Sequence, residues 1–234
     1  MAALRDRLTK PRFLLAYLFV GYFLVVARPS AHQMRLGVPL VLLGALLRVW
    51  ANGYVGHVKV NNARVGYLVT GGPYAYVRNP LYLGSLLIGT GLLVIAGRVW
   101  FAVITLGCLT IAYRWKILEE EALLRQEAPE AYARYARLVP RCLPTRRRYP
   151  DPTGRWSWQG LMASKEPKTL AWVVVLVVAL YFWEAYLQDR WVLFQKHGPL
   201  NVVLLSLMVV LMVSDGALEL ASRRARRPAA KESR

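Results

Sequence analysis

Six apolar runs, each too long for a β-strand, constrain the fold of this chain more than any other feature of its sequence. They cover residues 13–27, 37–54, 81–96, 99–113, 170–186 and 200–213. A helix needs about 20 apolar residues to cross a bilayer, and basic residues at its ends can extend a shorter run by snorkelling. Hydrophobic residues make up 56% of the chain and charged residues 19%, which is fewer charges than a soluble domain carries. The sequence therefore predicts an all-α, polytopic membrane helix bundle with about six transmembrane helices.

The basic residues predict how this bundle is oriented. A net charge of +18 is compatible with nucleic-acid binding, but the Lys and Arg residues lie between and after the apolar runs, as at cytoplasmic membrane edges. With the N-terminus inside, segments 1–12, 55–80, 114–168 and the C-terminal tail hold 25 of them, and the outside turns hold five. We therefore expect both termini in the cytoplasm, membrane lipids as partners and no nucleic acid. The first run should remain as a helix, because no cleavage site follows it.

The loop before the third run is the most informative polar stretch. Gly71-Gly72-Pro73 predicts an irregular backbone. Asn79 is a good N-cap and Pro80 suits the first helical position, so a helix should begin here. Its free N–H groups and positive dipole end would face the loop, where they could bind a carboxylate or phosphate. A plain junction between loop and helix is the alternative.

A second charged group follows the predicted hairpin of the third and fourth runs. Residues 116–138 should form a cytoplasmic helix, which the topology brings to the same side as the loop. Lys116 can pair with Glu120, and Glu121 with Arg125, at helical spacing i,i+4. The simpler interpretation is that these acids stabilise the helix through such ion pairs and have no further role. The alternative is that one of them faces the hairpin and meets Arg78 or a cationic ligand.

Charged residues within the apolar runs are few. Arg48 lies near the inner end of the second run, and Trp50 and Tyr54 indicate the membrane boundary there, so we interpret Arg48 as snorkelling to the interface. The sequence has no nucleotide-binding glycine motif and no Ser-His-Asp arrangement. It also has no metal-spaced His/Cys cluster, so no metal site is expected. A transporter is disfavoured because no chain of charged residues crosses the bilayer.

Residues 68–84 resemble the signature of the isoprenylcysteine carboxyl methyltransferase and phospholipid methyltransferase superfamily, usually Gly-Pro-Tyr-x-Tyr-x-Arg-His-Pro-x-Tyr-x-Gly. Three further motifs match in order and spacing: Glu120-Glu121-x-x-Leu124, Tyr132-x-x-Tyr135 and Val139-Pro140-Arg141. Together they cover about residues 60–141. The last two predicted spans are an extension that no motif assigns.

This resemblance implies an integral-membrane enzyme that transfers a methyl group from S-adenosylmethionine to a lipophilic acceptor. An acceptor like the carboxylate of isoprenylcysteine is preferred, with a phospholipid or a small thiol as the alternative. Arg78, Glu120 and Arg141 are the implied catalytic residues, with Arg141 facing an acceptor carboxylate or lipid phosphate. The implied cofactor-binding residues are Gly72, Pro73, Tyr74, Tyr76, Arg78, Asn79, Pro80, Tyr82, Gly84, Glu120 and Glu121.

Two departures from the family pattern bear on this assignment. Asn79 stands where His is commonest, and Asn can hydrogen-bond but cannot act as a base. Ala128-Pro129 replaces a typical Phe-Gly, and Pro129 should kink or divide the cytoplasmic helix. A non-catalytic lipid-binding or scaffold protein is the alternative from another class.

The sequence suggests four parts. Residues 1–54 hold two transmembrane helices, and 55–141 hold the catalytic core. Residues 142–168 form a basic interfacial segment, and 169–234 hold two further helices and a basic tail.

Overall fold

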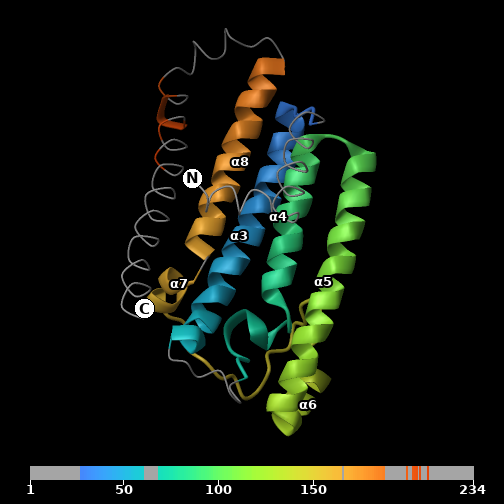
Figure 1. The fold of residues 1–234 in the computed structure, drawn as a ribbon, viewed down its shortest axis with the longest axis vertical. Helices are drawn as coiled ribbons and strands as arrows, with labels where there is room; N and C mark the ends of the chain where they lie inside the picture. The colour runs from blue at the N-terminus through green and yellow to red at the C-terminus, as the bar shows by residue number, and fades with distance from the viewer. Residues whose placement is uncertain are drawn as a thin grey trace, which may run out of the picture.

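The structure is a computed structural model that describes residues 27–60, 68–164 and 166–187, with a few isolated positions between 199 and 210. Every regular element in these residues is a helix (Figure 1), which confirms the all-α prediction. In chain order they are α3 (Ala31–Val60), the 3-10 helix η1 (Gly72–Ala75), α4 (Pro80–Ala96), α5 (Val99–Glu127), α6 (Pro129–Leu138), α7 (Trp158–Ala163) and α8 (Glu166–Leu187).

Three of these helices are long and apolar enough to cross a membrane, over Ala31–Val55, Val99–Glu127 and Glu166–Tyr186. The shorter α4 is also apolar. Most of the predicted runs 13–27 and 200–213 lies outside the described residues. A total of six transmembrane helices therefore stays a prediction.

Glycines allow α3 and α4 to pack backbone to backbone. Gly37 and Gly44 on α3 face Gly91 and Gly84 on α4, with a spacing of seven residues on each helix. A Cβ atom on Gly44 would lie 2.6 Å from the Gly84 carbonyl oxygen, and one on Gly91 would lie 2.6 Å from that of Gly37. Small residues at such positions let membrane helices approach closely. These contacts fix the antiparallel pair to which the other helices attach.

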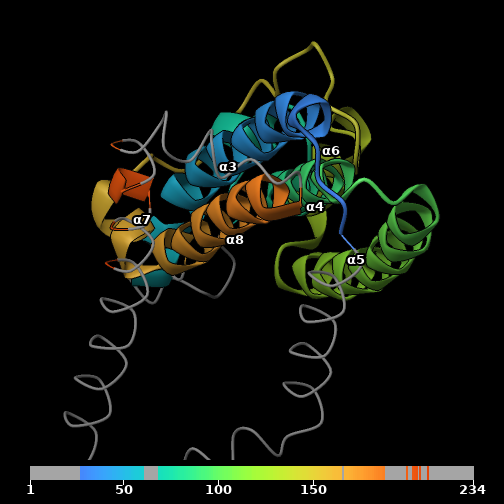
Figure 2. The same cartoon turned by 90° about the horizontal axis from the view of Figure 1, so that it is seen from above.

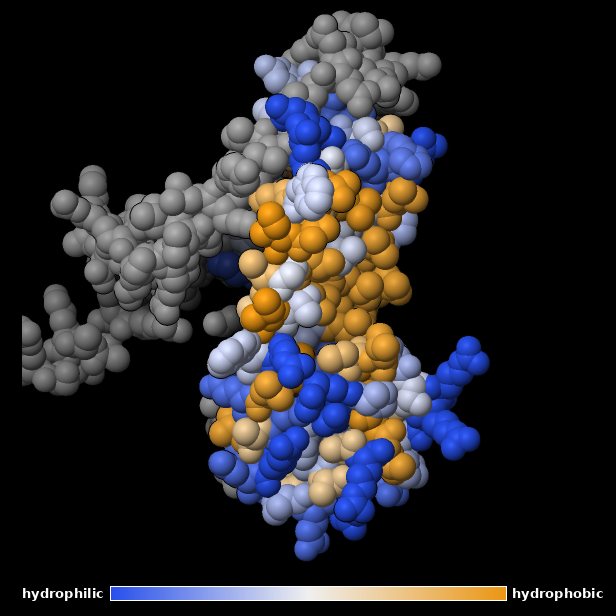
Figure 3. Space-filling model, turned by 90° about the vertical axis from the view of Figure 1, so that its right-hand side faces the viewer, coloured by the Kyte–Doolittle hydropathy of each residue, from blue (hydrophilic) through white to orange (hydrophobic). Residues whose placement is uncertain are grey.

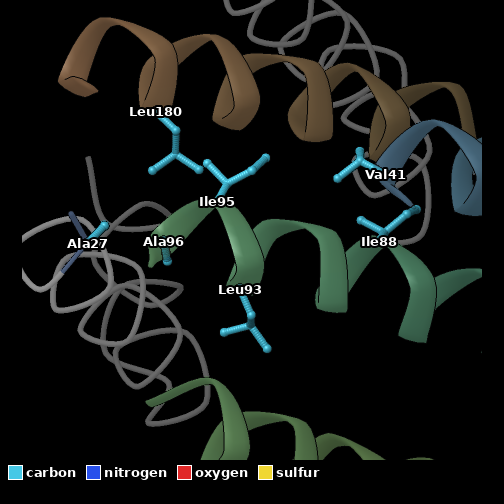
Figure 4. Packing of buried hydrophobic residues seen from close by; sticks show 7 residues of the cluster. All are labelled: Ala27, Val41, Ile88, Leu93, Ile95, Ala96 and Leu180. Atoms are coloured by element: carbon cyan, nitrogen blue, oxygen red, sulfur yellow. The ribbon is translucent and has the colours of Figure 1, made fainter. Parts of the chain in front are cut away.

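Helix α8 packs against this pair, and α5 stands farther out beside α4 (Figure 2). A buried cluster joins α8 to α3 and α4, with Leu180 beside Ile95, and Val41 beside Ile88 (Figure 4). By contrast, α5 exposes large apolar side chains, including Trp100, which is 82% exposed. From the α5 side the surface shows an apolar band between hydrophilic ends (Figure 3). An apolar surface of this extent is expected where lipid, rather than water, surrounds the helices.

The helix ends near the predicted loop agree largely with the sequence. Helix α4 begins at Pro80 and ends at Gly97, whose φ of 70° closes the tight turn into α5. Helix α5 then continues without a break to Glu127, so the fourth span and the start of the cytoplasmic helix are one element. Pro129 begins α6 after a non-helical Ala128, which confirms the predicted division.

A segment that we call the strap, residues 140–157, runs back beneath the loop before α4. Its main chain bonds to that of the loop and of α3. Arg78 N–H donates to the Pro140 carbonyl (2.9 Å), Tyr149 N–H to Ala75 (3.0 Å), Gly71 N–H to Thr153 (2.8 Å) and Ser157 N–H to Gly53 (2.9 Å). The strap thereby holds the irregular Gly-Gly-Pro segment in one conformation.

The interpretation of Arg48 as a snorkelling residue is wrong. Its guanidinium pairs with Glu166 at 2.6 Å, and the Glu166 side chain is only 3% exposed. The cause is the start of α8 at Glu166, four residues before the predicted span. This start brings a carboxylate to the inner end of α3.

Candidate functional site

A cavity of about 330 Å³ lies where the end of α3, the loop, the start of α4 and the α5–α6 junction meet. Seven predicted site residues line it: Tyr74, Arg78, Asn79, Pro80, Tyr82, Glu120 and Glu121. Apolar and aromatic side chains complete the lining: Val55, Leu68, Val69, Leu81, Leu124, Tyr132 and Tyr135. The structure thus brings the two sequence motifs together around one cavity, with a polar and an apolar part.

Glu121 is the electrostatic centre of this site. Its carboxylate accepts hydrogen bonds from Arg141 Nε (3.0 Å) and Nη2 (2.8 Å). Arg78 Nη1 lies 3.2 Å away, and Arg125 Nη2 lies 3.7 Å away. Bidentate, charge-assisted contacts of this kind are strong and directional. The contact with Arg125 confirms the predicted pair, and the contact with Arg78 is the one that the alternative interpretation of these acids described.

Arg141 lies behind the cavity rather than on its wall, because Glu121 holds its guanidinium. The hydrogen bond with Glu121 raises the pKa of Arg141 further above its already high ordinary value. Arg141 therefore stays charged and fixes Glu121 in place.

Among the described residues, the Arg78 side chain makes its polar contacts through a single nitrogen atom, Nη1. Its Nη1 atom donates to the Tyr132 hydroxyl (3.0 Å) as well as lying beside Glu121. Its Nε atom is buried and has no hydrogen-bond partner in the described structure. Buried donors without a partner are uncommon in folded proteins, so this guanidinium is less completely hydrogen-bonded than that of Arg141.

Glu120 lies at the exposed side of the cavity. Its carboxylate accepts a hydrogen bond from the Tyr82 hydroxyl (2.8 Å). The predicted pair with Lys116 is wrong, since Lys116 instead pairs with Glu119 (2.8 Å), one residue nearer in sequence. Among the residues that the structure describes, no Lys or Arg lies within ion-pair distance of Glu120. Within the described part of the chain, the site therefore presents one carboxylate that no cation neutralises.

Asn79 occupies the N-cap position of α4, but its side chain makes no capping hydrogen bond. It donates instead to the Arg141 carbonyl (3.1 Å) and lies 3.5 Å from the Glu121 carboxylate. Asn79 thus joins the strap to the Glu121 cluster. Pro80 and Leu81, at the start of α4, form the cavity wall beside it.

Three buried tyrosines, Tyr74, Tyr135 and Tyr149, lie next to one another beside the cavity. The Tyr135 hydroxyl donates to the Tyr74 carbonyl (2.7 Å), and the Tyr135 ring packs edge-on against Tyr149. Burial raises the pKa of both Tyr74 and Tyr135 well above the ordinary value. Their hydroxyls therefore stay protonated at neutral pH.

Four of the residues predicted to bind the cofactor lie outside the cavity lining. Gly72, with φ +59°, leaves room for the Tyr54 ring, and Gly84 leaves room for Arg48 and Gly44. Pro73 is buried within η1, and Tyr76 packs against the cluster formed by the α6 tyrosines.

Sequence reasoning assigned no site role to Tyr132 and Tyr135, although their motif spacing singled them out. Among the apolar lining residues, Val55 carried no motif. Leu68 and Val69 begin the matched stretch 68–84, but they precede the signature that starts at Gly72, and no site role was assigned to them.

Comparison with known families defines the class of protein. The family model for phospholipid methyltransferases, which are membrane methyltransferases, matches residues 32–127. The match lies within the isoprenylcysteine and phospholipid methyltransferase superfamily and confirms the resemblance seen in the motifs for this part of the chain. No curated protein and no solved structure matches the chain. The family match covers α3, η1, α4 and α5, and ends before α6, the strap and α8.

Proposed function

We propose that this protein transfers a methyl group from S-adenosylmethionine to the head group of a membrane lipid. The observation that carries the proposal is the composition of the cavity. Among the residues that the structure describes, it joins a carboxylate without a cationic partner, Glu120, and an incompletely bonded arginine, Arg78, to an apolar lining. Such a combination suits a ligand that carries both charges next to an apolar group.

The residues of the cavity fit this cofactor. S-adenosylmethionine, when bound, supplies a methyl group on a positively charged sulfur. Arg78, which belongs to the cavity lining, would hold its carboxylate. Glu120 would face a cationic group, and Tyr82 orients that carboxylate. The aromatic face of Tyr74 can attract a sulfonium by cation–π interaction.

The charges favour a lipid amine as the acceptor over the carboxylate preferred from the sequence. A carboxylate acceptor needs a cation of its own, but Arg141 already binds Glu121 and Arg78 is the residue proposed to hold the cofactor carboxylate. An ammonium acceptor needs a carboxylate near it, which Glu120 provides. A carboxylate there can also receive the proton that the ammonium loses before its nitrogen attacks. The description of the matched family as phospholipid methyltransferases supports the same choice.

The chain's contribution to the transfer itself is alignment. Val55, Leu68 and Val69 form an apolar side of the cavity suited to an acyl chain. Holding acceptor and methyl donor in one orientation can supply much of the rate acceleration of such a reaction.

The test is transfer of a radiolabelled methyl group from S-adenosylmethionine to a total membrane lipid extract by the purified protein. We expect label in lipids with amine head groups. The Glu120→Gln variant should lose at least about 90% of this activity, because general-base and charge contributions are typically on the order of a hundredfold. Glu119→Gln, which alters the neighbouring exposed acid, should retain it. Absence of label from lipid with the unaltered protein would refute the proposal, and label in a carboxyl ester would refute the choice of acceptor.

A further inference from the structure

Arg48 and Glu166 form a buried pair that joins three helices. From α3, Arg48 donates through Nε (2.7 Å) and Nη2 (2.6 Å) to the two carboxylate oxygens of Glu166, the first residue of α8. Its Nη1 atom donates to the Ser85 hydroxyl (2.5 Å) and to the Leu81 carbonyl (3.4 Å) on α4. One guanidinium on α3 therefore contacts both α4 and α8.

The surroundings complete the hydrogen bonds of this pair. Asn52, one turn after Arg48 on α3, donates to the Glu166 carboxylate (2.8 Å) and to the Arg48 carbonyl (3.2 Å). The Ser164 hydroxyl accepts from the Glu166 N–H (3.1 Å). The side chain of Arg48 is 18% exposed and that of Glu166 is 3% exposed. A charge in the apolar part of a membrane protein usually has a specific partner and a functional reason.

The pair lies directly behind the wall of the cavity. Leu81, whose carbonyl accepts from Arg48, lines the cavity, and so does its neighbour Tyr82, which bonds to Glu120. On α3, Val55 lines the cavity one turn after Asn52. Gly84 has no side chain where the Arg48 stem passes, since a Cβ there would lie 2.6 Å from Arg48 Cγ. The Arg48–Glu166 pair thus holds the first turn of α4 and the end of α3 together, on the side of the wall that faces away from the cavity.

We infer that Arg48 and Glu166 are positioning residues through which α8, outside the matched family region, holds one wall of the proposed methyl-transfer cavity. This inference rests on the proposed function. Glu166 fixes the Arg48 guanidinium, and Arg48 fixes the first turn of α4, which carries Tyr82 opposite Glu120. The C-terminal extension that no motif explained then completes the site.

Two variants distinguish this positioning role from a role in stability alone. Glu166→Gln removes the charge that fixes Arg48. The double variant Arg48→Met with Glu166→Leu replaces the pair by apolar side chains, which often preserves or raises stability. It still removes the donor to Leu81 and Ser85. Glu119→Gln, which breaks the exposed pair with Lys116, is the matched control.

The experiment combines hydrogen exchange with calorimetric binding of S-adenosylmethionine, using the full chain in detergent. In Glu166→Gln and in the double variant we expect faster amide exchange in residues 80–85. We also expect a dissociation constant about tenfold higher, within the range seen for residues that act without touching the ligand. The double variant should unfold at or above the wild-type temperature, and the control should match the wild type throughout.

Wild-type exchange in residues 80–85 in either variant would overturn the inference. So would wild-type affinity in a stable double variant, because the pair would then serve stability alone. If the unaltered protein binds no cofactor, the proposed function fails, and the exchange measurement still decides whether the pair holds the wall.

Discussion

At the scale of single residues, one carboxylate organises the site. Glu121 is buried, and three arginines from different elements surround it: Arg78 from the loop, Arg125 from α5 and Arg141 from the strap. Removing the charge of a buried acid leaves its cationic partners without compensation, which costs more than the pair itself contributes. Glu121 therefore acts on stability first and on the ligand through Arg78.

Replacing Glu121 by Gln should strongly destabilise the protein. We expect a loss of about 3–5 kcal/mol, the range for breaking a buried ion pair. Arg125→Gln removes a partner that is 60% exposed and 3.7 Å away, so its effect should stay below about 1 kcal/mol. Thermal unfolding in detergent measures both changes. Equal effects of the two substitutions would contradict the central place of Glu121.

The sequence predicted that these charged residues belong to the site, but it did not predict all of the residues that they contact. The spacing of Glu121 and Arg125 on one helix predicted their pair correctly, because local geometry decides it. Arg141 and Arg78 reach Glu121 only through the strap and the loop, and no helical spacing encodes that contact. Asn79 was expected to cap α4, but tertiary contacts with Glu121 and Arg141 take its side chain instead.

At the scale of helices, the contact between α3 and α4 sets the position of the cavity. The glycines at 37, 44, 84 and 91 bring the two backbones together, and α4 presents its first turn to the cavity as a result. Without a hydrophobic driving force in lipid, close backbone packing is a main source of helix association.

A large side chain in this contact should separate the helices. Gly91→Leu places a side chain against the Gly37 carbonyl, so we expect a destabilisation of at least about 1–3 kcal/mol, as for overpacking elsewhere. Gly107→Leu on α5 is the control, because nothing lies within 4 Å of a Cβ atom there. Unfolding temperatures of the two variants provide the comparison. A neutral Gly91→Leu would show that the helices do not pack this closely.

Helix boundaries followed from sequence where a local signal marks them. Pro80 and Pro129 each begin a helix, and Gly97 ends one with a positive φ, all as their chemistry requires. The start of α8 carries a similar signal, Pro167 in its first turn after Ser164, but the predicted span began only at the first apolar residue, Leu170. Glu166 was therefore assigned to the loop, although it pairs with Arg48. This single displaced boundary is why the role of Arg48 was misjudged.

At the scale of the whole molecule, the excess of basic residues predicts which end faces the cytoplasm. The cavity, the strap and α6 lie at one end of the apolar helices (Figure 1). The positive-inside rule predicts that this end faces the cytoplasm, where S-adenosylmethionine would be available.

The two cysteines test this orientation without any new residue. Cys142 is exposed in the strap, and Cys108 lies in the apolar part of α5. A membrane-impermeant thiol reagent should modify Cys142 only from the cytoplasmic side. It should not reach Cys108 from either side, because a membrane-impermeant reagent does not enter the apolar interior of the bilayer. Modification of Cys142 from the outside would reverse the predicted topology.

The central claim is that the cavity between the loop and α5 holds the methyl donor, and calorimetric titration with S-adenosylmethionine tests it most directly. We predict a dissociation constant in the micromolar range, equivalent to roughly −8 kcal/mol, for the purified protein. Glu120→Gln should weaken binding, and Glu119→Gln should leave it unchanged. Absence of binding to the folded, unaltered protein would contradict the claim, and so would undiminished affinity in Glu120→Gln.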